Sequence, residues 1–309
     1  MKGFVQALLL LLMSTLFASK SPSREVRLLN VGNSFTWSLH PYLGKMVEYE
    51  GKHKLYHRQC SVGGCELSRH WRYAEEFEKE GKREYSWGRD AEGNEIFISL
   101  KEALATASWD VVTVQQASHE SWRPECYLPW GEKLVNYIRE NAPQATVMLQ
   151  RTWSYRSDAP RLAEWGLTQE EMYHRLWLAY QDFAHRMNLP IIPAGDAIQL
   201  ARTLQKGVYQ PYGRDVVEKL VYPQLPDQSW SFINGFYWYK NEAGKYCPAD
   251  DTIHLNARGR YLQALVWYGV LFDEDPASVT YTPEEIEKED AVFLREVASM
   301  VLQKGFYRP

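Results

Sequence analysis

Apolar residues follow two alternating patterns along the chain. Short apolar runs predict five strands, at residues 25–31, 54–62, 108–116, 145–150 and 189–197. Between them, apolar residues recur at spacings of three or four, which predicts helices at 40–50, 67–79, 129–141, from 168, at 256–272 and from 282. Strands that alternate with helices predict an α/β fold, a three-layer α/β/α sandwich with a mainly parallel five-stranded sheet.

Capping signals mark two of these helix starts. Thr168 to Glu171 read TQEE, a capping box, and the helix behind it carries Met172 and Leu176 on one face. The segment TPEE at Thr282 predicts a second capped start.

Two stretches interrupt the alternation, near residues 83–98 and 206–250. Turn-forming residues at 90–94 and 241–244 predict a hairpin in each. We therefore predict one domain over residues 22–309 that carries two insertions.

The N-terminus has the pattern of a secretory signal peptide. Lys2 precedes an apolar stretch from Phe4 to Phe17, and small residues follow it. The stretch is shorter than the roughly 20 apolar residues that a membrane span needs. We predict a signal peptide at residues 1–21 and a secreted or periplasmic protein with no membrane span in its mature form. An uncleaved anchor is the alternative.

Export permits disulfides, and the chain has four cysteines, which allow three full pairings. Cys60 and Cys65 flank a short loop, whereas Cys126 and Cys247 are far apart in sequence. Both a bridge and free buried thiols are consistent with these positions. The net charge of -4 and the lack of a basic patch argue against a nucleic-acid partner. The oligomeric state is not set by the sequence.

Polar and glycine-rich blocks follow the predicted strands. The first strand ends in GNS, the second in SVGG and the third in QQASHE, and DDTIHLN stands near the end of the chain. Open parallel sheets bind their ligands at the carboxyl ends of the strands. We expect these blocks to meet at one edge of the sheet.

Three residues of these blocks suit nucleophilic catalysis. Ser34 follows Gly32 and stands near a helix N-terminus, where the helix dipole favours negative charge. A serine hydroxyl needs a base, which His254 can supply, and Asp251 can orient the imidazole. The alternatives are that Ser34 is a helix N-cap and that His254 is structural. A metal site of Asp250, Asp251, His254 and His119 lacks a recognised zinc pattern, and Cys65 has no base beside it in the sequence.

Together the four blocks resemble those of the SGNH/GDSL-type hydrolases. That family has a Gly-Asp-Ser block, a glycine, a Gly-x-Asn block and an Asp-x-x-His block in this order. More narrowly, the stretches LLNVGNSFT, WDVVTVQQASH and IHLNARGRYLQALVWYGVLF resemble DUF4886, a group of exported bacterial proteins. The resemblance covers roughly residues 25 to 273. It implies a flavodoxin-like fold, a Ser34–His254–Asp251 triad, ester hydrolysis, often on carbohydrate, and neither metal nor cofactor.

Two blocks depart from the family pattern. Asn33 replaces the usual aspartate, and the third block lacks Gly-x-Asn. The resemblance places the backbone N–H groups of Ser34 and Gly64 (or its neighbour Gly63) in an oxyanion hole. As the third donor we expect the side chain of Gln116 or His119, in preference to Gln115. Gly64 also suits a simple turn with positive φ.

Aromatic residues are abundant, with 12 Trp and 20 Tyr, and many stand in predicted loops. Flat rings can match the apolar faces of sugars, so we expect substrate contacts among Trp122, Trp153, Trp230 and Trp238; packing in the core is the alternative. Arg123 and Arg151 are candidates for pairing with a uronic acid carboxylate.

The sequence therefore predicts an exported serine esterase acting on an esterified carbohydrate or another small ester, most simply an O-acetyl ester. A methyl esterase on a uronate polymer and a non-catalytic glycan-binding protein are the alternatives.

Overall fold

The computed structural model describes residues 22–303, so the predicted signal peptide at residues 1–21 lies outside the described residues. A five-stranded sheet forms the centre, and every neighbouring pair in it is parallel. Its order is β2-β1-β5-β6-β7, with bounds of Lys54–Ser61, Glu25–Gly32, Val111–Val114, Thr146–Gln150 and Ile191–Ile192. Counted within the sheet this is the flavodoxin-like order 2-1-3-4-5. The predicted fold class is confirmed.

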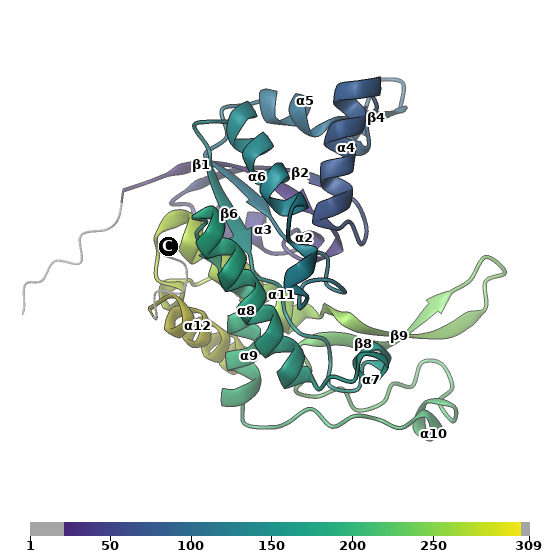
Figure 1. The fold of residues 1–309 in the computed structure, drawn as a ribbon. Coiled ribbons are helices and arrows are strands. Elements are labelled where there is room, and N and C mark those ends of the chain that lie inside the picture. The colour runs from purple at the N-terminus through teal and green to yellow at the C-terminus, as the bar shows by residue number, and fades with distance from the viewer. Residues whose placement is uncertain (1–21, 304–309) are drawn as a thin grey trace, which may run out of the picture.

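Helices cover both faces of this sheet (Figure 1). On one face α11 (Ala257–Phe272) packs against α3 (Leu43–Glu50), α9 (Ala194–Leu204) and α12 (Lys288–Gln303). The other face carries α4 (Leu67–Glu80), α5 (Leu100–Ala105), α6 (Trp130–Asn141) and α8 (Gln169–Met187). The short helices are α2 (Ser34–Trp37), α7 (Pro160–Trp165) and α10 (Arg214–Val217).

Strand β1 shows why its sequence is apolar at consecutive positions. Leu28 belongs to the core on one face of the sheet, while Leu29 and Val31 belong to the core on the other. Successive strand residues point to opposite faces, and both faces of a central parallel strand are buried.

Two hairpins lie outside the sheet. β3 (Tyr85–Arg89) pairs with β4 (Glu95–Ile98), and β8 (Ile233–Lys240) pairs with β9 (Tyr246–Leu255). The second hairpin projects from the body of the molecule (Figure 1). Its strand β9 continues beyond the predicted insertion, so Asp251 and His254 lie on a strand and not on a loop.

Several predicted boundaries are wrong. The third strand spans Val111–Val114 and not 108–116, so Gln115 and Gln116 already lie beyond it. The fifth strand has only two residues, because α9 already begins at Ala194.

The last helix begins at Lys288 and not at Thr282, because the chain first turns to bury Ile286, whose N–H donates to the Pro283 carbonyl. Among the helices of residues 22–303, none has the length and apolar character of a membrane span.

Candidate active site

Ser34 stands at the sharp turn between β1 and α2. Gly32 ends the strand, and a Cβ atom there would lie 2.3 Å from Thr36 Oγ1, so the turn requires glycine. Asn33 is the N-cap of α2, since its Oδ1 accepts a hydrogen bond of 3.1 Å from the Phe35 N–H. Ser34 is therefore the first residue of the helix and not its cap, which leaves its hydroxyl available to another partner.

The Asn33 side chain makes two further hydrogen bonds, which explain why asparagine stands here in place of the aspartate of the Gly-Asp-Ser pattern. Its Nδ2 donates to the Cys65 carbonyl at 3.1 Å, while its Oδ1 also accepts from Gln115 Nε2 at 2.7 Å. An ionised aspartate could accept the second bond but has no donor for the first. Asparagine thus ties the turn after β1 to the loop after β2 and to the end of β5.

The structure brings Ser34, His254 and Asp251 together, as the sequence predicted. His254 Nε2 lies 2.8 Å from Ser34 Oγ. His254 Nδ1 lies 3.0 Å from Asp251 Oδ2 and 3.1 Å from its Oδ1. The three side chains thus form a continuous hydrogen-bonded chain, in which the histidine ring is 30% exposed.

Asp251 is held in its ionised form. Partial burial by itself raises the pKa of the carboxyl, but hydrogen bonds from His254 and Asn234 hold it well below its usual range. Asn234 Nδ2 donates to Oδ2 at 2.9 Å, and the backbone N–H groups of Ile253 and His254 donate to Oδ1. An ionised Asp251 accepts a hydrogen bond from Nδ1–H of His254 and so keeps the proton on Nδ1, which leaves Nε2 to accept the Ser34 hydroxyl proton.

The His254 ring rests against a stack of two aromatic rings. The Phe35 ring contacts it edge-on, with centroids 5.6 Å apart, and Trp153 stacks under Phe35 at 4.1 Å. Trp153 Nε1 also donates to the Ile253 carbonyl at 2.9 Å. The prediction that Trp153 contacts substrate is wrong, because its side chain is fully buried. It supports the strand that carries His254.

The backbone N–H groups of Ser34 and Gly64 are the two that the sequence resemblance predicts in an oxyanion hole. Among the described residues, neither the Ser34 nor the Gly64 N–H has a hydrogen-bond acceptor. The loop that carries Gly64 is tied to the Ser34 turn, since the Val62 N–H donates to the Gly32 carbonyl at 3.2 Å. Gly64 has a φ of +61°, whereas Gly63 has no positive φ, so the conformational need for glycine falls on Gly64.

The side chain of Gln116 is not free to donate to the site, contrary to the prediction. It is fully buried, and its Nε2 donates to the Cys126 carbonyl at 2.9 Å. Its Oε1 accepts from the N–H groups of Leu67 and Ala117. These bonds link β5 to the start of α4, so the expected role as a free donor to the site does not fit this residue.

His119 remains beside the predicted oxyanion loop. Its Nε2 lies 3.1 Å from Oε1 of Glu66, which is the N-cap residue of α4 and follows Cys65. The side chain of His119 is 34% exposed. Gln115, which the sequence analysis ranked lower, is the glutamine that touches Asn33 beside the nucleophile turn.

The remaining predicted tryptophans are spread over the molecule. Trp122 is partly buried against Trp165, with centroids 5.4 Å apart. Trp230 lines a separate groove of about 500 Å³ to which no triad residue contributes. Trp238 packs edge-on against Phe236, and its Nε1 donates to the Gln224 carbonyl at 2.7 Å.

Of the two arginines predicted as candidates for binding a uronic acid carboxylate, the structure excludes Arg151. Arg151 is fully buried, and its Nη1 lies 2.7 Å from both Asp196 oxygens, so it cannot reach a substrate. The Arg123 guanidinium lies 4.7 Å from the Trp122 ring centroid.

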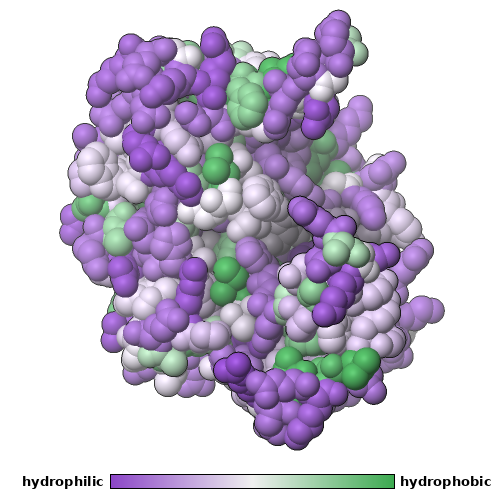
Figure 2. Space-filling view, turned by 90° about the vertical axis from the view of Figure 1, so that its right-hand side faces the viewer, coloured by the Kyte–Doolittle hydropathy of each residue, from purple (hydrophilic) through white to green (hydrophobic). Residues whose placement is uncertain are grey.

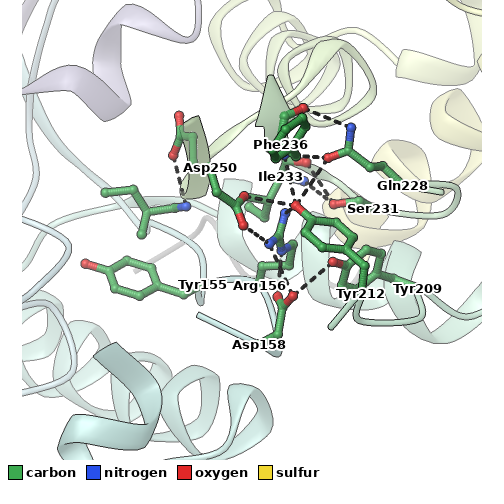
Figure 3. A network of polar contacts seen from close by, with 12 residues as sticks. Tyr155, Arg156, Asp158, Tyr209, Tyr212, Gln228, Ser231, Ile233, Phe236 and Asp250 are labelled. Atoms are coloured by element: carbon green, nitrogen blue, oxygen red, sulfur yellow. Dashed lines mark hydrogen bonds and ion pairs between the residues drawn. The ribbon is translucent and has the colours of Figure 1, made fainter. Parts of the chain in front are cut away.

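A buried arginine that the sequence analysis missed anchors strand β9. Figure 3 shows Arg156 between the carboxylates of Asp158 and Asp250, at 2.6 and 2.9 Å. Its backbone N–H donates to the Thr252 carbonyl at 3.0 Å, and Tyr212 contacts its guanidinium. Burial alone lowers the pKa of Arg156, but the two carboxylates raise it above its usual value. The only sequence signal was the closely spaced Arg156 and Asp158.

Other nucleophile and metal hypotheses fit the geometry less well. All four cysteines are free thiols, and burial raises the pKa of Cys65 to about 12, which keeps it protonated. Asp250 pairs with Arg156, on the side of β9 opposite to Asp251. In residues 22–303 no three His, Cys, Asp or Glu side chains are grouped so that they could hold a metal ion.

Fold and site together define a flavodoxin-like α/β/α protein with a Ser–His–Asp chain at the carboxyl edge of its sheet. Residues 27–222 match the family model described as a domain of unknown function, DUF4886. The chain belongs to this family, as its sequence resemblance predicted.

Solved structures extend this comparison. A DUF4886 family protein from Bacteroides uniformis is 25% identical, with a TM-score of 0.69, over 92% of this chain and 97% of that one. A protein from Slackia heliotrinireducens, described as a candidate SGNH hydrolase, is 19% identical, with a TM-score of 0.47, over 79% and 97%. A candidate GDSL-like lipase from Parabacteroides merdae is 13% identical, with a TM-score of 0.42, over 81% and 97%. No curated protein matches the chain.

Proposed function

We propose that the protein is a serine esterase that hydrolyses ester groups, most simply O-acetyl groups, on a carbohydrate. The observation that carries this proposal is the 2.8 Å contact between Ser34 Oγ and His254 Nε2, with Asp251 bound to the other ring nitrogen. The resemblance of the four sequence blocks to the SGNH hydrolases supports the same reaction class.

In the proposed reaction, His254 takes the hydroxyl proton while Ser34 Oγ attacks the ester carbonyl carbon. The carbonyl oxygen becomes negative and faces the N–H groups of Ser34, at the start of α2, and of Gly64, in the loop after β2. The C–O bond to the sugar then breaks, and the leaving oxygen takes the proton from His254. Water, activated by the same histidine, releases the acid and restores Ser34.

Charges near the site favour a neutral substrate over a uronate polymer. The cationic side chain nearest to Gly64 is Arg69, and it is paired with Glu66 at 3.2 Å. Arg156 is neutralised by two carboxylates, and Arg151 is buried. A uronic acid carboxylate beside Gly64 would therefore meet Glu66 and an arginine that is already paired with it, which makes methyl esterase activity on uronates the second candidate.

The test is an ester panel of p-nitrophenyl acetate, acetylated xylan and methylated pectin, applied to the wild type and to Ser34→Ala. We expect acetate release by the wild type, unaffected by EDTA, and a loss of several orders of magnitude in turnover for Ser34→Ala. Hydrolysis of pectin alone would shift the proposal to the methyl esterase. Absence of turnover on every ester would leave the glycan-binding alternative.

Export is part of the proposal, and the signal-peptide pattern of residues 1–21 supports it. Fractionation of cells that produce the full chain should place the protein in the medium or periplasm, shortened at its N-terminus. A full-length protein confined to the cytosol would contradict this.

A further inference from the structure

The projecting β8–β9 hairpin has two faces with different surroundings. From Gly235 to Lys240 the strand β8 pairs without interruption with Asp251 to Tyr246 of β9. Directly opposed residues of an antiparallel pair share a face, and successive residues alternate. Tyr237 and Tyr239 therefore lie on the same face as Asp251.

The opposite face is covered by the segment that precedes the hairpin. There Trp238 bonds the Gln224 carbonyl, and Tyr246 stacks on Tyr222 with ring centroids 3.6 Å apart. Asp250, which points to this side, meets Arg156.

Tyr237 and Tyr239 remain exposed on the face of Asp251. Each is 47% exposed, and neither has a ring contact or side-chain hydrogen bond among the described residues. The residues paired with them on β9 are Ala249 and Cys247, whose small side chains do not cover the two rings. With a rise of about 3.4 Å per residue, the rings stand roughly 7 and 14 Å along the strand from the level of Asp251.

The stem of the hairpin is held rigidly. The Phe236 N–H donates to Gln228 Oε1 at 2.6 Å and to the Tyr212 hydroxyl at 2.9 Å (Figure 3). At Gly235, with a φ of +85°, an added Cβ would lie 1.9 Å from Gln228 Oε1 and 2.7 Å from Arg156 Nη1. The strand that carries the two tyrosines is thus held at its base by contacts that need no ligand.

We infer that Tyr237 and Tyr239 form a distal subsite for a neutral polysaccharide whose esterified sugar lies at Ser34. The inference rests on the proposed function and specifies its substrate as an extended chain. Tyrosine offers a flat apolar ring and a polar tip, which suits a sugar ring with its apolar face and hydroxyl edge.

The composition of this face disfavours other occupants. Between Tyr237 and Tyr239, and across from them at residues 247–249, the face carries no charged residue for an ionic polymer and no aliphatic side chain larger than alanine for an acyl chain. Asp251, further along the same face, is already bound to His254. Figure 2 looks toward the free end of the hairpin and shows the surface hollowed between the hairpin and the body above it, with pale surface around the hollow.

The test compares two substrates in Tyr237→Ala, Tyr239→Ala and the double variant. We expect the ratio of kcat/KM for acetylated xylan to that for p-nitrophenyl acetate to fall roughly fivefold for each single variant and about 25-fold for the double variant. Tyr246→Ala, on the opposite face of the same hairpin, is the matched control and should keep the wild-type ratio. An unchanged ratio in the double variant, or an equal fall in Tyr246→Ala, would overturn the inference.

A binding measurement separates this inference from the proposed function. In a Ser34→Ala background, affinity electrophoresis in acetylated xylan should show retardation that the double tyrosine variant loses. If the wild type hydrolyses no ester but this retardation is found, the subsite stands and the esterase proposal fails. If esters are hydrolysed but retardation is equal with and without the tyrosines, the subsite fails alone.

Discussion

At the scale of single residues, the turn that carries Ser34 depends on side chains from distant parts of the sequence. His70, on α4, lies fully buried with its Nε2 3.1 Å from the Gly32 carbonyl and its Nδ1 2.8 Å from the Tyr85 hydroxyl. Since the carbonyl only accepts, Nε2 carries the proton and donates, and Nδ1 accepts from Tyr85. The neutral ring thus supports the backbone directly before the proposed nucleophile.

This burial predicts an acid-sensitive fold. Burial lowers the pKa of His70 from 6.5 to about 3, so the unfolded chain binds a proton that the folded chain does not. Stability from this group is complete above pH 6.5 and is lost as the pH falls from 6.5 toward 3. Urea unfolding of the wild type and His70→Asn should show a stability difference that shrinks by roughly 1 kcal/mol per pH unit in this window. Parallel pH profiles for the two proteins would show that His70 is not the group responsible.

Residue identity was enough to predict the triad but not the roles of its neighbours. A serine, a histidine and an aspartate at the matching positions of the blocks indicate a nucleophile, its base and the group that orients the base. Gln116 and Trp153, by contrast, were predicted from their side-chain type and from their position at the end of a predicted strand. Their burial and hydrogen bonds depend on contacts with other segments, since Gln116 binds the Leu67 N–H and Trp153 binds the Ile253 carbonyl, 49 and 100 residues away.

At the scale of elements, the β8–β9 hairpin carries the proposed subsite on β8 and the Asp251 and His254 side chains of the proposed chemistry on β9. One side of β9 presents Asp251 to His254, and the other presents Asp250 to Arg156. Arg156 additionally holds the Thr252 carbonyl, so it is a positioning residue that acts on the strand between the two aspartates.

Arg156→Met should therefore affect both stability and turnover. Removing one partner from a buried ion-pair network leaves charges uncompensated, which costs on the order of 3 kcal/mol. The proposed esterase should also lose kcat at temperatures where urea curves show the variant folded, because β9 is no longer fixed. Arg186→Met, which breaks an exposed pair with Asp182 at 3.0 Å, is the control and should cost less than about 1 kcal/mol. Equal small effects of the two variants would refute the anchoring role.

Most elements could be predicted from the sequence because their signals are local. The capping box at Thr168 marks the start of α8, and the short apolar runs identified the five strands of the sheet. The start of α12 could not be predicted in this way. The segment TPEE has the pattern of a helix start, but the burial of Ile286 keeps it in a turn. The faces of the β8–β9 hairpin likewise depend on its pairing register and on the segment packed against it.

At the scale of the whole molecule, the site lies where the strand order of the sheet reverses. Strands β2 and β5 flank β1, and the chain after β1 and β5 supplies Ser34 and Gln115 at this edge. Helix α11 follows β9 directly and packs against the sheet-covering helices α3, α9 and α12, which fixes His254 over Ser34. The proposed active site is thus assembled from both ends of the described chain, 220 residues apart.

The central claim is that His254 activates Ser34 as a nucleophile. The most direct measurement is mass spectrometry of the protein after reaction with a fluorophosphonate, which attaches covalently to activated serines. We predict one adduct, mapped to the peptide that contains Ser34, and its loss in Ser34→Ala and in His254→Ala, where the serine is present but lacks its base. An unlabelled Ser34, or labelling that persists undiminished in His254→Ala, would contradict the account.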